Sequence, residues 1–199
     1  MSTVSVGSIV PDFEMDTYDP TTGGFGKFSL AANKAARRWT VLVFYPADFT
    51  FVCPTELADL GDRYEDLKKA GAEVVSVSTD TRFTHLAWRR DERLLSNVTY
   101  PMGADPTGEI SRLFGVYNSA SGLARRGTFI ITPDGELASA EISYGDVGRN
   151  ADELLRKLQA CIYVYENPGQ ACPAKWVPGA RTLTTGAKIV GKVYEALNA

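Results

Sequence analysis

The run Trp39-Thr-Val-Leu-Val-Phe-Tyr45 strongly constrains which fold this chain can adopt. Its residues are β-branched, aliphatic or aromatic with no polar–apolar alternation, which is typical of a strand buried on both faces of a sheet. Pro46 ends the run, and apolar residues then recur three or four positions apart from Leu57 to Leu67, as on one face of a helix. Glu73–Thr79 follows as a second buried strand, so the pattern predicts an α/β domain.

The second half of the chain adds a hairpin and a long helix. Residues 127–132 are typical of a strand, Pro133-Asp-Gly-Glu136 is a strong turn signal, and residues 137–144 would pair back as an antiparallel strand. Apolar residues at helical spacing then mark one face of a helix between Leu154 and Tyr165. Together these elements predict a central mixed β-sheet flanked by helices.

Residues 167–199 differ in composition, because they are rich in Gly, Pro and Thr and show no clear periodicity. We therefore expect residues 1–166 to form one domain and residues 167–199 to form a C-terminal arm that leaves it. Such an arm would lie on a partner subunit.

Charge and hydropathy exclude several classes of partner. The chain has 21 basic and 24 acidic residues and a net charge of −3, which gives no field for nucleic acid or an anionic membrane. Met1–Val6 has neither the basic nor the apolar segment of a secretory signal, and no apolar run approaches the ~20 residues that span a bilayer. We expect a soluble cytoplasmic protein without nucleic-acid or membrane partners.

Three cysteines in a reducing compartment indicate catalysis, metal binding or plain burial rather than a disulfide framework. A metal site is disfavoured, because the chain has no Cys-x-x-Cys pair and His85 is its only histidine. We expect no cofactor. For His85 a packing or interface role is favoured over a catalytic one.

Cys53 follows the first buried strand and would lie in the first turn of the next helix. At this position the unpaired backbone N–H groups and the positive end of the helix dipole stabilise a thiolate. Pro54 suits an early helical position, and Thr50 can direct a hydroxyl to the same place. The alternative is a small buried hydrophobic residue, the commoner fate of a free cysteine, and position alone leaves both interpretations open.

The surrounding residues resemble the peroxiredoxin family. Pro46-x-x-x-Thr50-x-x-Cys53 matches its active-site signature, and the segment Tyr45–Glu56 is similar to its alkyl hydroperoxide reductase (AhpC) branch. The likeness covers nearly the whole chain, through Ser76–Thr81, Phe83–Trp88, Arg126–Phe129, Leu154–Lys157 and Ala171–Trp176. No single fragment suffices, but the ordered set is highly specific.

The resemblance implies a thioredoxin-like fold and a thiol peroxidase that reduces hydrogen peroxide or organic hydroperoxides to water or alcohols, in antioxidant defence and redox homeostasis. Cys53 would be the attacking thiolate and would become a sulfenic acid. Thr50, the Cys53 backbone N–H and Arg126 would stabilise the departing oxyanion, and Pro46 would exclude water from the pocket.

The choice of the catalytic arginine and two further charged residues belong to this expectation. Arg126 is preferred over Arg125 as the catalytic arginine, because it directly precedes the strand and successive residues entering a strand point in opposite directions. Glu56 and Arg149 match family positions that orient the catalytic arginine; the alternative is an ordinary surface ion pair.

The other cysteines differ in context. Cys161 falls on the apolar stripe of the last long helix, so we expect a buried structural thiol. Cys172 lies in an irregular segment and matches the family's resolving cysteine, which implies an intersubunit disulfide with Cys53 of a partner chain. The resemblance also implies thioredoxin or a flavoprotein disulfide reductase as electron donor, and a homodimer that assembles into a decameric ring.

Two other functions remain to be weighed. A thioredoxin-like dithiol oxidoreductase is disfavoured by the missing Cys-x-x-Cys pair and by Thr50. An oligomeric holdase or redox-relay protein is compatible with peroxidase activity and would coexist with it.

Overall fold

The computed structural model describes residues 3–198 and divides into two compact units. The first runs through Ala151, and the second begins at Asp152. This division falls after the first residue of the last long helix. The boundary after residue 166 that the sequence suggested stays a prediction.

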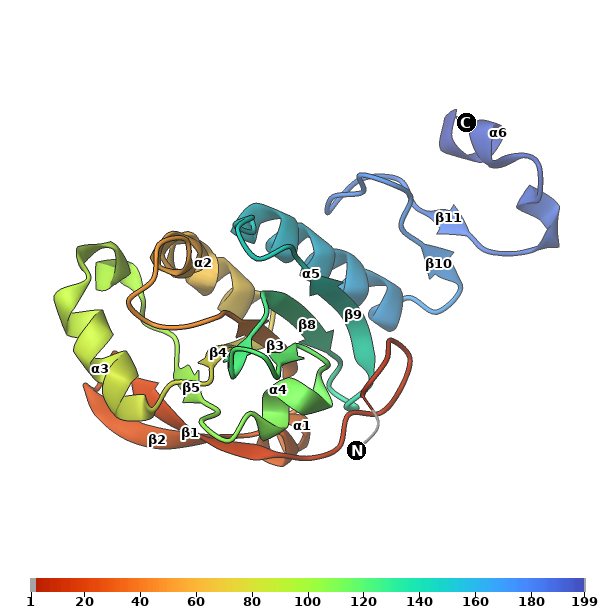
Figure 1. Ribbon diagram of the computed structural model, residues 1–199. Coiled ribbons are helices and arrows are strands. Elements are labelled where there is room, and N and C mark those ends of the chain that lie inside the picture. Colours follow the sequence, from red (N-terminus) through yellow and green to blue (C-terminus); the bar gives the residue numbers. More distant parts are fainter. Residues whose placement is uncertain (1–2, 199) are drawn as a thin grey trace. The chain divides into compact units, whose positions relative to one another are not determined.

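A mixed sheet of seven strands forms the centre of the first unit (Figure 1). Strands β5, β4 and β3 run parallel to one another, and every other pairing is antiparallel. The strand order is β2 (Gly24–Ser29), β1 (Glu14–Asp19), β5 (Met102–Ala104), β4 (Ala72–Ser78), β3 (Trp39–Phe44), β8 (Gly127–Ile131) and β9 (Leu137–Ile142). The α/β class with a central mixed sheet, predicted from the sequence, is confirmed.

Strand β3 lies inside the sheet between β4 and β8, and all six of its residues are buried, as its unbroken apolar run predicts. Its Leu42 and Phe44 belong to a core shared with the helices α1 (Leu30–Ala35) and α4 (Glu109–Leu113). Figure 1 shows α2 (Cys53–Lys69) and α3 (Arg82–Asp91) on the other side of the sheet. The chain therefore covers both faces of the sheet, as the parallel strands β5, β4 and β3 require.

Helix α2 confirms the spacing predicted between Leu57 and Leu67. Leu57, Leu60 and Leu67 are buried, and the exposed positions of the helix are polar or small. Lys68 and Lys69 in the last turn complement the negative end of the helix dipole. This packing holds the first turn of α2, and with it Cys53, in a fixed place over the sheet.

The hairpin of β1 and β2 was not predicted. The structure pairs β1 with β2 in antiparallel register from Glu14↔Ser29 to Asp19↔Gly24. Strand β1 also pairs with β5, so the hairpin extends the sheet on that side. Glycines in β2 and carboxylates in β1 weaken the local strand signal.

Short elements complete the first unit. They are η1 (Arg93–Asn97), β6 (Tyr117–Asn118) and β7 (Leu123–Ala124), and the last two pair as a hairpin. Gly127 follows Arg126 at the start of β8, and a Cβ atom there would approach Phe129 and Val116 to 2.8 Å. This crowding explains why a residue without a side chain occupies position 127.

In the second unit the helix α5 (Ala151–Glu166) is followed by a segment that turns back along it. The rings of Tyr163 and Trp176 lie 5.1 Å apart, and Arg156 donates a hydrogen bond to the Trp176 carbonyl oxygen. The remaining elements are a hairpin of β10 (Gln170–Ala171) and β11 (Leu183–Thr184), then η2 (Ala187–Ile189) and α6 (Val193–Asn198). Within residues 3–198 no helix combines the length and apolar character needed to cross a bilayer.

Candidate active site

Cys53 is the first residue of α2 and is fully buried. It lies beyond the carboxyl end of β3, where open α/β sheets bind their ligands. Val52 is the N-cap and provides no side-chain hydrogen bond, and Pro54 follows within the first turn, where the lack of an N–H costs little. The predicted position of Cys53 in the first helical turn is confirmed.

Arg126 brings a charged donor to this sulfur. Its Nη1 lies 3.3 Å from Cys53 Sγ, and its Nε donates to the Gly145 carbonyl oxygen at 2.6 Å. Arg126 is buried whereas its neighbour Arg125 is exposed, as the alternation along the strand predicted. Burial alone would lower the pKa of Arg126, but its hydrogen bond to Cys53 and the charge of Glu56 raise it.

Glu56 joins Arg126 to Arg149. Its Oε2 accepts from Arg126 Nη1 at 2.5 Å, and its Oε1 accepts from Arg149 Nε at 2.8 Å and from the Arg149 backbone N–H at 2.9 Å. Burial would raise the pKa of Glu56, but hydrogen bonds from Arg149 and the charges of both arginines hold it below its usual value. All three side chains are nearly or fully buried, so this is no surface ion pair.

Pro46 and Thr50 frame the loop that precedes Cys53. Thr50 Oγ1 donates to the Ala47 carbonyl oxygen at 2.8 Å, so its single proton is directed into the loop, and its role towards a peroxide stays a prediction. Pro46 lines a hollow of about 680 Å³, together with Gly145 and the hairpin of β6 and β7. The Gly145 carbonyl oxygen accepts a hydrogen bond from Arg126, so this hollow adjoins the arginine that contacts Cys53.

A buried polar cluster anchors the same loop, and the sequence did not reveal it. Asp48 accepts from Tyr45 Oη at 2.7 Å and contacts His85 Nδ1 at 2.7 Å, and its backbone N–H donates to Asp80. Burial raises the pKa of Asp48, although the His85 contact partly opposes it. His85 also contacts the Gly103 carbonyl oxygen, in agreement with the packing role expected for it. No local pattern relates Asp48 to a histidine 37 positions away.

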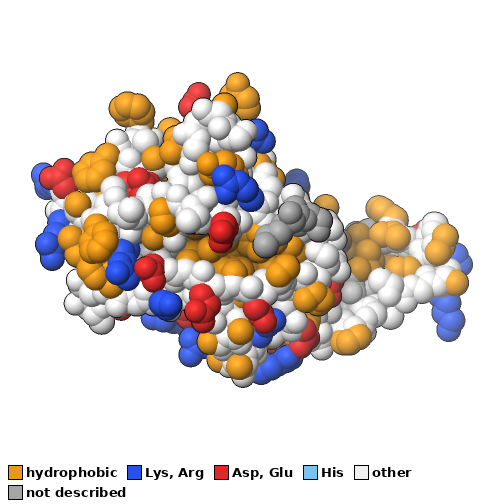
Figure 2. Space-filling model, turned by 60° about the horizontal axis from the view of Figure 1, so that its bottom comes forward, with side chains coloured by type: hydrophobic (Ala, Val, Ile, Leu, Met, Phe, Trp, Pro, Cys, Tyr) orange, Lys and Arg blue, Asp and Glu red, His pale blue; other side chains and the backbone are white. Residues whose placement is uncertain are grey.

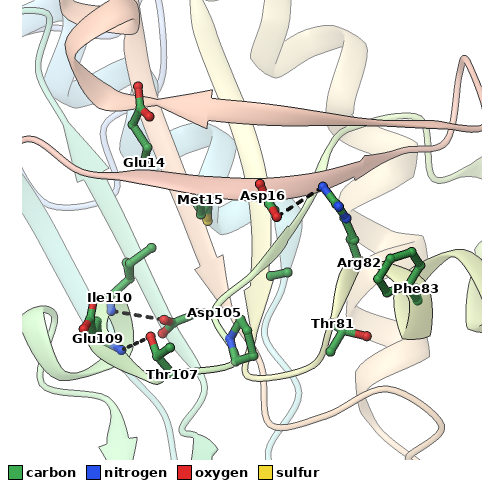
Figure 3. Close-up of a pocket in the computed structure, with 12 residues that line it drawn as sticks. Glu14, Met15, Asp16, Thr81, Arg82, Phe83, Asp105, Thr107, Glu109 and Ile110 are labelled. Carbon is green, nitrogen blue, oxygen red and sulfur yellow. Dashed lines mark hydrogen bonds and ion pairs between the residues drawn. The ribbon is translucent and has the colours of Figure 1, made fainter.

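A second hollow, of about 340 Å³, lies at the carboxyl ends of β4 and β5 (Figure 3). Arg82 pairs there with Asp16 at 3.1 Å, and Asp105 accepts from the Ile110 backbone N–H. Burial raises the pKa of Asp105, although backbone donors oppose the shift. None of the predicted site residues lines this hollow.

Cys161 and Cys172 both lie in the second unit, and neither is fully buried. The expectation of a buried Cys161 is therefore only partly met, because its stripe on α5 is buried at Leu154 and Leu158 but half-buried from Cys161 onward. Cys172 Sγ lies 3.9 Å from the Ala160 carbonyl oxygen. Burial raises the pKa of both thiols, opposed by Lys157 at Cys161 and by Arg156 at Cys172.

Two further observations concern ligands. In the face shown in Figure 2, basic and acidic side chains are interspersed, so that face carries no extended basic surface. Among residues 3–198, no three or more His, Cys, Asp or Glu side chains are grouped in a way that would hold a metal ion.

Comparisons with known proteins agree with this geometry. Residues 6–140 match the model of the AhpC/TSA family. Alkyl hydroperoxide reductase C of Staphylococcus aureus is 48% identical over 181 residues, which cover 91% of this chain and 95% of the relative.

Solved structures show the same likeness. Enterococcus faecalis AhpC has a TM-score of 0.79 at 42% identity and covers 84% of this chain and 98% of its own. The reduced 2-Cys peroxiredoxin of Plasmodium vivax has a TM-score of 0.83 at 29% identity, with coverage of 90% and 92%. These neighbours are thioredoxin-fold enzymes, in agreement with the predicted fold. A family model over more than half of the chain and a relative 48% identical over 91% of it show that the chain belongs to the AhpC/TSA family of peroxiredoxins.

Proposed function

We propose that this protein is a thiol peroxidase that reduces hydrogen peroxide and organic hydroperoxides with Cys53. The observation that carries the proposal is the buried contact of 3.3 Å between Arg126 Nη1 and Cys53 Sγ. Arg126, Arg149 and Glu56 together leave one positive charge in excess. A Cys53 thiolate balances that charge, so these four groups are neutral when the sulfur is ionised.

In the reaction, the Cys53 thiolate attacks the terminal oxygen of the hydroperoxide, the O–O bond breaks, and the sulfur becomes a sulfenic acid. The departing hydroxide or alkoxide takes up a proton and leaves as water or an alcohol. Arg126 is placed to stabilise the oxyanion as its charge develops, because Glu56 and Gly145 already fix its guanidinium. Thr50 and Pro46 complete the pocket in this proposal.

Cys172 of a partner chain would then attack the sulfenic sulfur and release water, which leaves an intersubunit disulfide. A dithiol donor such as thioredoxin or a flavoprotein disulfide reductase would restore both thiols. The likeness to a 2-Cys peroxiredoxin, the Plasmodium vivax neighbour, supports a two-cysteine cycle. The protein would be a homodimer that assembles into a decameric ring. The reducing cytoplasm suits this cycle, because the disulfide must be reduced after each turnover.

The test is stopped-flow peroxide consumption by the wild type, Cys53→Ser and Cys172→Ser, followed by non-reducing electrophoresis. We expect no consumption by Cys53→Ser, and a single turnover without a disulfide-linked dimer for Cys172→Ser. Consumption that survives in Cys53→Ser would contradict the proposal. An insulin-reduction assay separates it from a dithiol oxidoreductase, for which that assay would be positive.

A further inference from the structure

The segment after α5 runs back along the helix and brings Cys172 next to Cys161. Cys172 Sγ lies 3.9 Å from the Ala160 carbonyl oxygen. The carbonyl carbon of Ala160 is bonded to the backbone nitrogen of Cys161, so Cys172 Sγ lies within about 7 Å of Cys161 Cα. The Cα of Cys172 lies about 3 Å from its own Sγ, so the two Cα atoms are at most about 10 Å apart. Bridged cysteines have Cα atoms about 4.4–6.8 Å apart, so side-chain rotation with a backbone shift of at most a few ångströms would join the two sulfurs.

Other contacts hold this arrangement in the second unit. The ring of Trp176 packs against Tyr163, and its carbonyl oxygen accepts from Arg156. The hairpin of β10 and β11 supports the segment on its other side, where Thr182 donates to Gln170. Both the hairpin and Trp176 contact Tyr163 of α5, and Cys172 lies between them in the sequence. Cys161 is a half-buried thiol that the reaction proposed above does not use.

We propose that Cys161 is a third redox residue. By thiol–disulfide exchange, it would replace the Cys53 of the partner chain as the disulfide partner of Cys172 in its own chain. The Cys161 thiolate attacks Cys172 Sγ of the intersubunit disulfide. The Cys161–Cys172 bond forms, the bond between Cys172 and Cys53 of the partner breaks, and Cys53 leaves as the thiolate. No external oxidant or reductant takes part.

Two features of the chain favour this exchange. The attack is intramolecular, with only ten residues between the two cysteines, so the effective concentration of the Cys161 thiol is high. The leaving group is a thiolate that Arg126 stabilises, and stable thiolates leave fastest. The oxidising equivalent would then lie on the C-terminal segment, accessible to a dithiol donor, while Cys53 is free for another peroxide.

The inference rests on the proposed function, and the experiment distinguishes a failure of the exchange from a failure of the peroxidase cycle. Reduced wild type and Cys161→Ser receive one equivalent of hydrogen peroxide per chain, without reductant, and are alkylated at successive times. Trypsin cleaves at no residue between Lys157 and Lys175, so both cysteines lie in the one peptide 158–175. An internal disulfide lowers the mass of that peptide by about 2 Da and prevents its alkylation.

For the wild type we expect a disulfide-linked dimer that decays to monomer, with the lighter peptide appearing as Cys53 becomes alkylatable again. The decay should accelerate as the pH rises, because the thiolate is the attacking form. In Cys161→Ser the dimer should persist. Val164→Ser, on the exposed side of the same helix, is the matched control and should behave as the wild type.

A dimer that persists in the wild type, or that decays equally fast in Cys161→Ser, would overturn the inference and leave the peroxidase intact. The absence of any Cys53-dependent dimer would contradict the proposed resolution step and the exchange that depends on it. The pair is also tested without peroxidase chemistry: in Cys53→Ser, the thiol oxidant diamide should produce the lighter peptide 158–175. Failure of that closure overturns the inference whatever the peroxidase does.

Discussion

Glu56 connects two arginines from different parts of the chain, and one of them, Arg126, contacts Cys53. Arg126 directly precedes strand β8, and Arg149 lies in the loop before α5. Without the carboxylate, two buried guanidinium groups would lie close together with no acid between them. Removing one partner of a buried ion pair costs far more than breaking a surface pair, because it leaves an uncompensated buried charge.

We therefore expect Glu56→Gln, which preserves shape but removes the charge, to lower the free energy of unfolding by about 3 kcal/mol. Chemical denaturation with fluorescence detection measures this. Glu65→Gln on the exposed side of the same helix removes only the surface pair with Lys68 and should cost less than about 1 kcal/mol. Equal losses in the two variants would show that the buried position of Glu56 has no energetic effect.

The same carboxylate predicts a dependence on pH. The pKa of Glu56 lies below its ordinary value in the folded protein, so its stabilisation is complete above the unfolded pKa of about 4.3 and is lost as the pH falls through the folded pKa. The difference in unfolding free energy between wild type and Glu56→Gln should shrink on acidification from about pH 6 to about pH 3. A difference that stays constant over this range would contradict the assignment.

Arg126 differs from Arg125 in that it offers a planar, buried guanidinium to the reacting sulfur. Lysine keeps the charge at this position but cannot donate to Cys53, Glu56 and Gly145 together. We expect Arg126→Lys to lower kcat/KM for hydrogen peroxide about a hundredfold, the effect of removing an oxyanion donor. Arg125→Lys is the matched control and should change kcat/KM less than twofold in the same stopped-flow assay, because Arg125 is exposed.

At the scale of elements, predictability follows the range of the interactions. Strand β3, helix α2 and the hairpin of β8 and β9 were predicted, because burial on both faces, helical spacing and turn chemistry are local properties. The hairpin of β1 and β2 was missed, since β1 becomes a strand by pairing with β5, far along the chain, where Asp16 lies opposite Ala104.

The residues of the candidate site also differ in whether local sequence predicts them. The reactive position of Cys53 follows from the strand and helix around it, whereas Arg126, Glu56 and Arg149 came from the family resemblance and not from any spacing. Asp48 was missed altogether, although it anchors the loop before Cys53. Phe49 in that loop has a φ of 56°, in the left-handed region, which a side chain adopts only where surrounding contacts hold it.

The anchor of this loop can be tested at Asp48. In Asp48→Ala, Tyr45 and His85 lose a buried acceptor, so the free energy of unfolding should fall by about 1–3 kcal/mol. Because the loop positions Thr50 and Pro46, kcat/KM for hydrogen peroxide should fall as well. Asp91→Ala, on an exposed position of α3, is the control for both measurements. A loss of stability with full activity would show that the cluster has no part in placing the loop.

At the scale of the whole molecule, the proposed cycle requires two chains, because Cys53 of one is resolved by Cys172 of the other. Neither Cys53→Ser nor Cys172→Ser alone has both thiols. In a mixed dimer of the two variants, however, the Cys53 of one chain faces the Cys172 of its partner at one of the two sites of a two-fold symmetric dimer. Resolution within a single chain gives no such complementation, since neither chain carries the pair.

We expect a disulfide-linked dimer on non-reducing gels when the two variants are mixed, allowed to exchange between dimers and treated with hydrogen peroxide, and none from either variant alone. Random exchange makes about half of the dimers mixed, each with one working site of two, so the number of disulfides should approach about a quarter of the wild-type number. Mass spectrometry of the linked peptides identifies Cys53 and Cys172 as the partners. If the chains exchange, as tagged chains can verify, and no linked dimer forms, resolution does not occur between chains and the two-chain cycle is wrong.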